Sequence, residues 1–105
     1  MEMKINWTDF SKIQLQKIFD YYNENVSLRV AKNLIENIVK EPQSIIKAPY
    51  LGQVEPSLFE LKETYRYVIY KSYKIIYSVD EINNLINIAD VFDTRQNPEK
   101  IGRKK

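Results

Sequence analysis

Cysteine and histidine are both absent from this sequence, and glycine occurs only twice. Without cysteine the chain has no disulfide framework, no thiolate nucleophile and no thiolate metal site. Without histidine it lacks the commonest general base and the commonest metal ligand at neutral pH. So few glycines also argue against a glycine-rich loop that cradles phosphates. We therefore expect neither a bound metal nor a small-molecule cofactor.

Long apolar runs are missing as well. No stretch approaches the roughly 20 apolar residues that cross a bilayer. The first residues lead directly into a strand pattern and contain no apolar core of a signal peptide. We expect a cytoplasmic protein without a membrane partner.

The length and composition fit a single globular domain over residues 1–105. Hydrophobic residues make up 44% of the 105 positions, which is ordinary for a chain with one core. The 16 basic and 14 acidic residues leave a formal charge of +2, which by itself indicates no class of partner. Residues 99–105 form a polar, basic tail, for which solvation is the simple explanation and contact with phosphate the alternative.

The first half of the chain has the pattern of one strand followed by two helices. Residues 3–7 alternate as a short strand does, and Thr8 is a good helix N-cap. The helix that follows ends near 23–25, and Ser27 can cap a second one. The expected buried positions recur at helical spacing: Leu15, Ile18, Phe19 and Tyr22, then Leu28, Ala31, Leu34, Ile35 and Ile38. The short connection predicts an antiparallel helical hairpin, and the segment 48–56 reads as a loop.

The second half is rich in β-branched and aromatic residues. The runs 65–70, 73–79 and 85–95 are separated by turn-like polar residues, which predicts a three-stranded antiparallel meander. A short N-terminal strand, a helical hairpin and this meander make the fold class α+β. Helices on one face of an antiparallel sheet leave the other face open to solvent or to a partner.

The length of the first turn of the meander decides how its basic residues are placed. With a two-residue turn at Lys71-Ser72, paired residue numbers sum to 143, and Arg66 and Lys74 fall on opposite faces. A longer loop or a bulge shifts the register and brings them together. Because Lys71-Ser72 lacks Asn-Gly chemistry, we expect the longer loop and a shared basic face.

Several short motifs, taken in order, resemble the RelE/ParE toxins of bacterial type II toxin–antitoxin modules. They are Pro49-x-x-Gly52, Glu60-Leu61, Tyr65-Arg66, Tyr73-Lys74-Ile75-Ile76-Tyr77 and Val91-Phe92-Asp93-Thr94-Arg95-Gln96-x-Pro98. The resemblance implies an α+β sheet with a helical hairpin and a cognate antitoxin as partner. It also implies one of two activities. RelE-like toxins cut messenger RNA on the ribosome, and ParE-like toxins poison DNA gyrase.

The resemblance places three basic residues at possible catalytic positions: Arg66, Lys74 and Arg95. In RNA cleavage they would stabilise charge on the phosphate, with a lysine, Glu60 or Glu63 as candidate base. Two acid–base residues of family nucleases are missing, since Phe92 and Asp93 stand where some carry a histidine and no tyrosine follows Tyr77. The simpler interpretation is that these cations are paired surface residues, and that Tyr73 and Tyr77 belong to the core.

Three functional hypotheses follow. The first and preferred one, which the basic residues on the strands favour, is a toxin that cuts messenger RNA on the ribosome as a metal-independent endoribonuclease (an mRNA interferase). The second is a toxin that poisons DNA gyrase, and the long helical hairpin and the missing acid–base residues favour it. The third is a non-catalytic module whose aromatic sheet binds a protein or an RNA.

Overall fold

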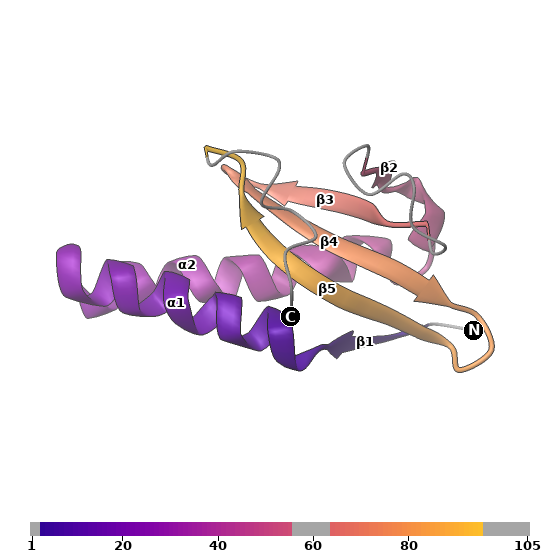
Figure 1. Cartoon of the computed structure of the whole chain (residues 1–105), viewed down its shortest axis with the longest axis horizontal. Helices are drawn as coiled ribbons and strands as arrows, with labels where there is room; N and C mark the ends of the chain where they lie inside the picture. Colours follow the sequence, from indigo (N-terminus) through magenta and orange to yellow (C-terminus); the bar gives the residue numbers. More distant parts are fainter. Residues whose placement is uncertain (1–2, 56–63, 96–105) are drawn as a thin grey trace.

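The computed structural model describes residues 3–55 and 64–95 and has the expected α+β architecture (Figure 1). The elements in chain order are β1 (Lys4–Trp7), α1 (Asp9–Asn25), α2 (Leu28–Lys40), the 3-10 turns η1 (Glu41–Ile45) and η2 (Pro49–Leu51), β2 (Gln53–Val54), β3 (Arg66–Tyr70), β4 (Tyr73–Asp80) and β5 (Leu85–Asp93). The sheet has the strand order β1-β5-β4-β3-β2. Residues 99–105, and the candidate bases Glu60 and Glu63, lie outside the described residues.

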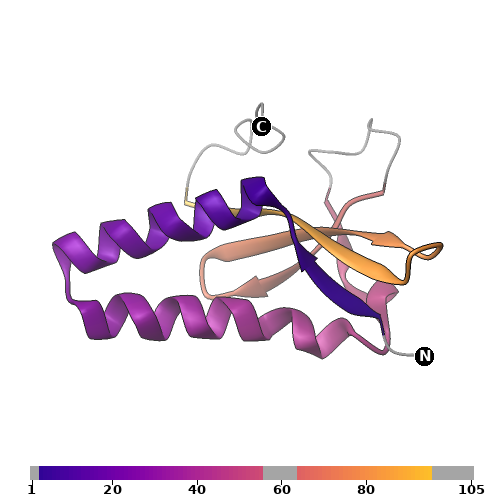
Figure 2. The ribbon, with the colours of Figure 1, turned by 90° about the horizontal axis from the view of Figure 1, so that it is seen from below.

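Both predicted helix starts are confirmed. The side-chain oxygen of Thr8 accepts a hydrogen bond from the Ser11 amide, and that of Ser27 accepts one from the Val30 amide. The two helices pack side by side along one face of the sheet, and the end of their hairpin extends beyond the turn between β3 and β4 (Figure 2). None of the helices in residues 3–55 and 64–95 has the length and apolarity that crossing a membrane requires.

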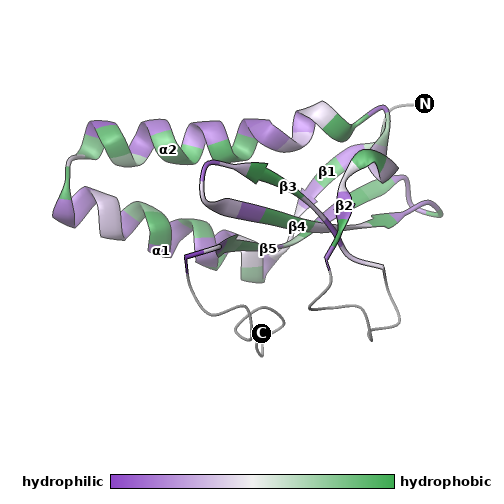
Figure 3. Cartoon of the chain, turned by 90° about the horizontal axis from the view of Figure 1, so that it is seen from above, coloured by the Kyte–Doolittle hydropathy of each residue, from purple (hydrophilic) through white to green (hydrophobic). Residues whose placement is uncertain are grey.

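Near the tip of the helical hairpin, the buried residues differ from those that the sequence predicts. Leu28 was expected in the core but is 54% exposed, because it lies where the hairpin has passed the edge of the sheet. In the first half of α1 the buried side chains are Ser11 and Gln14, neither of which was expected in the core. Elsewhere the helices are amphipathic, with apolar and polar residues alternating along their length (Figure 3).

The meander is confirmed, but the expected longer turn between its first two strands is wrong. Lys71 adopts a positive φ of 53°, so a two-residue turn closes the β3–β4 hairpin. Arg66 is therefore paired with Tyr77, and Lys74 with Ile69. Alternation along the strands puts Arg66 on the helix-covered face and Lys74 on the opposite face. The expected shared basic face does not form.

Two strand pairings lie outside the sequence prediction. The segment expected as a loop contains β2, which pairs antiparallel with the start of β3. β1 pairs in parallel with β5, the last strand of the chain, so β5 and β4 occupy the middle of the sheet. A bulge in β5 at Ala89 shifts the β4–β5 register between Ile76 and Tyr77.

The main core lies between the helices and the sheet and contains both tyrosines expected there. Its buried members include Leu34, Ile38, Tyr73, Ile75, Tyr77, Ile86, Ile88 and Val91. The hydroxyls of both tyrosines are satisfied: Tyr77 donates to the Pro49 carbonyl and Tyr73 donates to the Tyr22 hydroxyl. A smaller cluster on the other face contains Ile76 and Phe92, with Tyr65 and Tyr67 packed against it.

Candidate functional site

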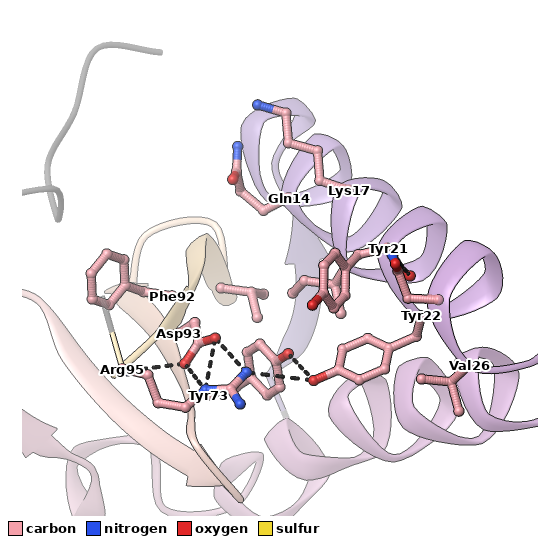
Figure 4. A pocket seen from close by; sticks show the side chains of 12 residues that line it. Gln14, Lys17, Tyr21, Tyr22, Val26, Tyr73, Phe92, Asp93 and Arg95 are labelled. Atoms are coloured by element: carbon pink, nitrogen blue, oxygen red, sulfur yellow. Dashed lines mark hydrogen bonds and ion pairs between the residues drawn. The ribbon is translucent and has the colours of Figure 1, made fainter. Parts of the chain in front are cut away.

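A groove of about 860 Å³ runs between α1 and the end of β5 (Figure 4). Three kinds of residue line it. They are aromatic (Tyr21, Tyr22, Tyr73, Phe92), aliphatic (Ile18, Val26, Val91), and polar or charged (Gln14, Lys17, Asn25, Asp93, Arg95). Of the three basic residues expected from the sequence, Arg95 is the one that lies in this groove.

The strand register brings the polar end of the groove together. Tyr73, at the start of β4, pairs with Asp93, at the end of β5. The chain turns directly after Asp93, and the Arg95 amide donates to an Asp93 carboxylate oxygen over 2.9 Å. Tyr22 reaches the same place from α1, so three elements contribute to one cluster (Figure 4).

Arg95 is held by a side-on ion pair. Its Nε donates to Asp93 Oδ1 over 3.0 Å and its Nη2 donates to Oδ2 over 2.7 Å. The same Nη2 approaches the Tyr22 hydroxyl at 3.4 Å, and the Tyr73 hydroxyl donates to Tyr22, also over 3.4 Å. Bidentate contact with a carboxylate fixes the plane of a guanidinium and so limits its possible orientations.

The cluster shifts the protonation equilibria of its members. The Arg95 guanidinium holds the pKa of Asp93 below its usual range. Hydrogen bonds from Tyr73, first, and from Arg95 lower the pKa of the Tyr22 hydroxyl. Burial, first, and the hydrogen bond to Tyr22 raise the pKa of Tyr73. Of the two tyrosines, Tyr22 is therefore the one whose proton is more easily removed.

Arg66 lies outside the groove, and its side chain is hydrogen-bonded to the backbone around η2. Its Nη1 donates to the carbonyls of Tyr50 (3.3 Å) and Gly52 (3.0 Å). Its guanidinium lies 5.4 Å from the centre of the Tyr50 ring. These contacts tie η2 to the first strand of the meander.

Lys74 is on the opposite face of the sheet from Arg66 and is paired. Its Nζ lies 2.8 Å from Glu55 Oε1 and 4.3 Å from the centre of the Tyr67 ring. Glu55 directly follows β2 and is 1% exposed. A buried carboxylate needs a cationic or hydrogen-bonding partner, so this contact has a structural explanation.

Two residues of this cluster are absent from the site residues predicted by the sequence: Tyr22 is expected in the core, and Asp93 is noted only as a position where some family nucleases carry a histidine. Tyr22 recurs at helical spacing and reads as a core residue, while Asp93 acquires its partner only through the turn at 94–95. The Pro49-x-x-Gly52 motif, by contrast, does mark a position where the structure requires a particular residue. A Cβ on Gly52 would lie 2.1 Å from the Tyr77 hydroxyl, so the ring of Tyr77 requires glycine there.

A family model described as the ParE toxin of the type II toxin–antitoxin system, parDE, matches residues 5–98. The chain belongs to the ParE toxin family. This makes it the toxin of a type II toxin–antitoxin system and implies a cognate antitoxin as its partner.

A solved structure supports the ParE fold. The structure titled "Chromosomal ParDE TA system from P. aeruginosa" superposes with a TM-score of 0.71 at 19% sequence identity. The match covers 88% of this chain and 96% of that chain. At this identity the likeness concerns the fold alone. No curated protein sequence matches the chain.

Proposed function

We propose that this ParE-family toxin stops growth by poisoning DNA gyrase. The family match points to ParE-like toxins, and the RelE/ParE resemblance attributes gyrase poisoning to that branch. The observation that carries the choice is the separation of the three basic residues. RNA cleavage by attack of a 2′-hydroxyl needs cations that converge on one phosphate.

The strand register separates these cations in two directions. Arg66 and Lys74 point to opposite faces. Arg66 is level with Tyr77, whereas Arg95 lies past the level of Tyr73, which is four residues nearer the start of β4. At about 3.3 Å per residue this is roughly 13 Å along the strand direction. Each cation also contacts protein groups already, which argues for structural roles.

The test uses purified toxin, gyrase and supercoiled plasmid. We expect the toxin to inhibit supercoiling and to accumulate cleaved plasmid covalently attached to gyrase. In cells, brief induction should arrest growth and induce a DNA-damage response. Folded Arg66→Ala and Lys74→Ala variants should still arrest growth, because neither residue acts as a catalyst in this mechanism.

Cleavage of messenger RNA on the ribosome is the second candidate, and one observation favours it. Arg95 lies beside Tyr22, whose pKa is lowered, so one groove holds a cation and a hydroxyl that loses its proton more readily than an ordinary tyrosine does. Primer extension on messenger RNA after induction distinguishes the two candidates. Cuts within translated codons that disappear with Arg95→Ala, without cleaved plasmid in the gyrase assay, would replace the gyrase proposal.

A further inference from the structure

We propose that the outer edge of β1 is a dimer interface, at which β1 pairs antiparallel with β1 of a second copy of the chain. A two-fold axis passes between the two Asn6 residues, so that Ile5 of each copy lies opposite Trp7 of the other. This edge is separate from the groove, whose lining residues come from other elements. The proposal therefore does not depend on gyrase being the target.

β1 is an edge strand whose outer side is open. It is the first strand in the order of the sheet, and its main neighbour among residues 3–55 and 64–95 is β5. In Figure 1, β1 forms the lower margin of the sheet. Figure 2 is seen from that side, and β1 lies in front of β5 with no helix or strand of the described residues covering it. An open edge offers unpaired backbone groups to a further strand.

The hydrogen bonds of β1 show which of its backbone groups are unpaired. The amides of Lys4 and Thr8 donate to the carbonyls of residues 84 and 88 over 3.0 and 3.2 Å, so the even-numbered residues face β5. The amides and carbonyls of Ile5 and Trp7 point away from the sheet and have no partner within residues 3–55 and 64–95. In the dimer each Ile5 lies directly opposite a Trp7, and residues opposite each other in this way exchange two hydrogen bonds.

The side chains of the two strands also match under this symmetry. Ile5 and Trp7 face the helices and are partly buried against the main core. A β-branched side chain opposite an aromatic one is a favourable cross-strand pair. On the other face, Asn6 lies opposite Asn6 of the second copy. Its Nδ2 donates to Asn87 Oδ1 over 2.8 Å, which leaves one N–H and its own Oδ1 for the second Asn6.

The charges at the two ends of β1 favour the antiparallel arrangement. Lys4 begins the strand, Asp9 follows its end, and both are exposed. The register places Lys4 opposite Thr8 of the second copy and beside its Asp9, so that opposite charges lie near each other at both ends. A parallel arrangement would instead align the two lysines. A second copy thus fits this edge in its hydrogen bonds, its apolar side chains and its charges.

The first experiment uses the absence of cysteine from the sequence. Asn6→Cys puts one thiol of each copy beside the two-fold axis, at a pair whose Cα atoms are about 4.5 Å apart, within the range of a disulfide. Under mild oxidation we expect the purified toxin to become a covalent dimer. Lys4→Cys is the matched control on the same strand and face. Its two thiols are roughly 13 Å apart along the strands, so it should cross-link about tenfold more slowly.

The second experiment measures association without a cross-link. In sedimentation equilibrium the mass of the wild type should approach twice the 12.5 kDa of one chain as the concentration rises. The fluorescence of Trp7, the single tryptophan, should change over the same concentrations. Asn6→Asp places two carboxylates opposite each other and should weaken the dimer about tenfold or more. Asn33→Asp, the same change at an exposed position of α2, is the control. Circular dichroism verifies that each variant is folded.

Several results would overturn the proposal. A wild type that keeps the mass of one chain at every concentration has no such interface. Equal cross-linking of the two cysteine variants would mean that the copies meet without this register. A dimer that Asn6→Asp leaves intact forms through another surface. If hydrogen exchange of the Ile5 and Trp7 amides slows only when antitoxin is added, the edge binds a strand of the antitoxin instead. None of these measurements involves gyrase, so the two proposals fail independently.

Discussion

Gly52 shows how one residue can be fixed by its neighbour. Its backbone is extended, with φ −64° and ψ 150°, a conformation open to any residue. The constraint is space, because an added Cβ would lie 2.1 Å from the Tyr77 hydroxyl and 2.9 Å from two ring atoms. Tyr77 is fully buried and hydrogen-bonded to Pro49, so its ring has little freedom to move.

We therefore predict that Gly52→Ala lowers the free energy of unfolding by about 1–3 kcal/mol, the usual range for overpacking a core. Urea unfolding measures this, with Gln53→Ala, at the exposed next position, as the control. Adding Tyr77→Phe removes the closest atom and should recover part of the loss. Equal stability of Gly52→Ala and the wild type would show that Tyr77 can give way.

Asp93 should make part of the stability depend on pH. Arg95 lowers its pKa in the folded state below the ordinary value of 3.8. The ion pair therefore stabilises the fold fully above that value, and the contribution disappears as the pH falls through the folded-state pKa. The unfolding free energies of wild type and Asp93→Asn should differ at pH 6 and converge as the pH falls below the folded-state pKa of Asp93, which is lower than 3.8. Arg95 is largely exposed, so the difference should be modest and shrink at high salt.

At the scale of elements, the parts predicted correctly have strong local signals. Thr8 and Ser27 start both helices, and the β-branched runs become β3, β4 and β5. The failures come from tertiary context. β2 has only two residues, too short for any periodicity, and Lys71 takes a positive φ that its residue type does not predict. The parallel pairing of β1 with β5 joins the two ends of the described chain.

The candidate site was less predictable than the fold for the same reason. Arg95 was found through the resemblance, but its partners Asp93 and Tyr22 come from the turn after β5 and from α1. Arg66 and Lys74 were placed on one face, and the two-residue turn separates them. Side chains alternate between the two faces of a strand, so an error of one residue in the register moves a side chain to the opposite face.

The two helix caps should differ in their effect on stability. The Ser27 hydroxyl caps α2 and makes no other hydrogen bond within residues 3–55 and 64–95, so Ser27→Ala should lower the free energy of unfolding by about 1 kcal/mol. The Thr8 hydroxyl caps α1 and also donates to the Ile88 carbonyl over 2.7 Å, connecting the helix to β5. Thr8→Ala should therefore cost about 2 kcal/mol, the cap plus one hydrogen bond. Thermal unfolding of both variants compares them, and a larger loss for Ser27→Ala would contradict the role given to Thr8.

At the scale of the whole molecule, the end of the helical hairpin is a second surface, next to the end of the groove that Val26 lines. The hairpin passes the edge of the sheet and exposes apolar side chains, among them Leu28 (54%) and Val30 (40%), neither of which lines the groove (Figures 1 and 2). Apolar residues gathered on a projecting element are typical of a protein contact. If the toxin poisons gyrase, we expect this end of the hairpin to contact gyrase.

We predict that Leu28→Ser with Val30→Ser reduces gyrase-dependent plasmid cleavage at least tenfold. The physical reason is that the pair loses apolar contact area at the hairpin end and nothing in the groove. Stability should change by less than about 1 kcal/mol, as is usual for exposed positions. Val39→Ser, 37% exposed near the other end of α2, is the matched control. If the double variant cleaves as the wild type does, gyrase contacts another surface. If antitoxin binding falls as well, target and antitoxin compete for the end of the hairpin.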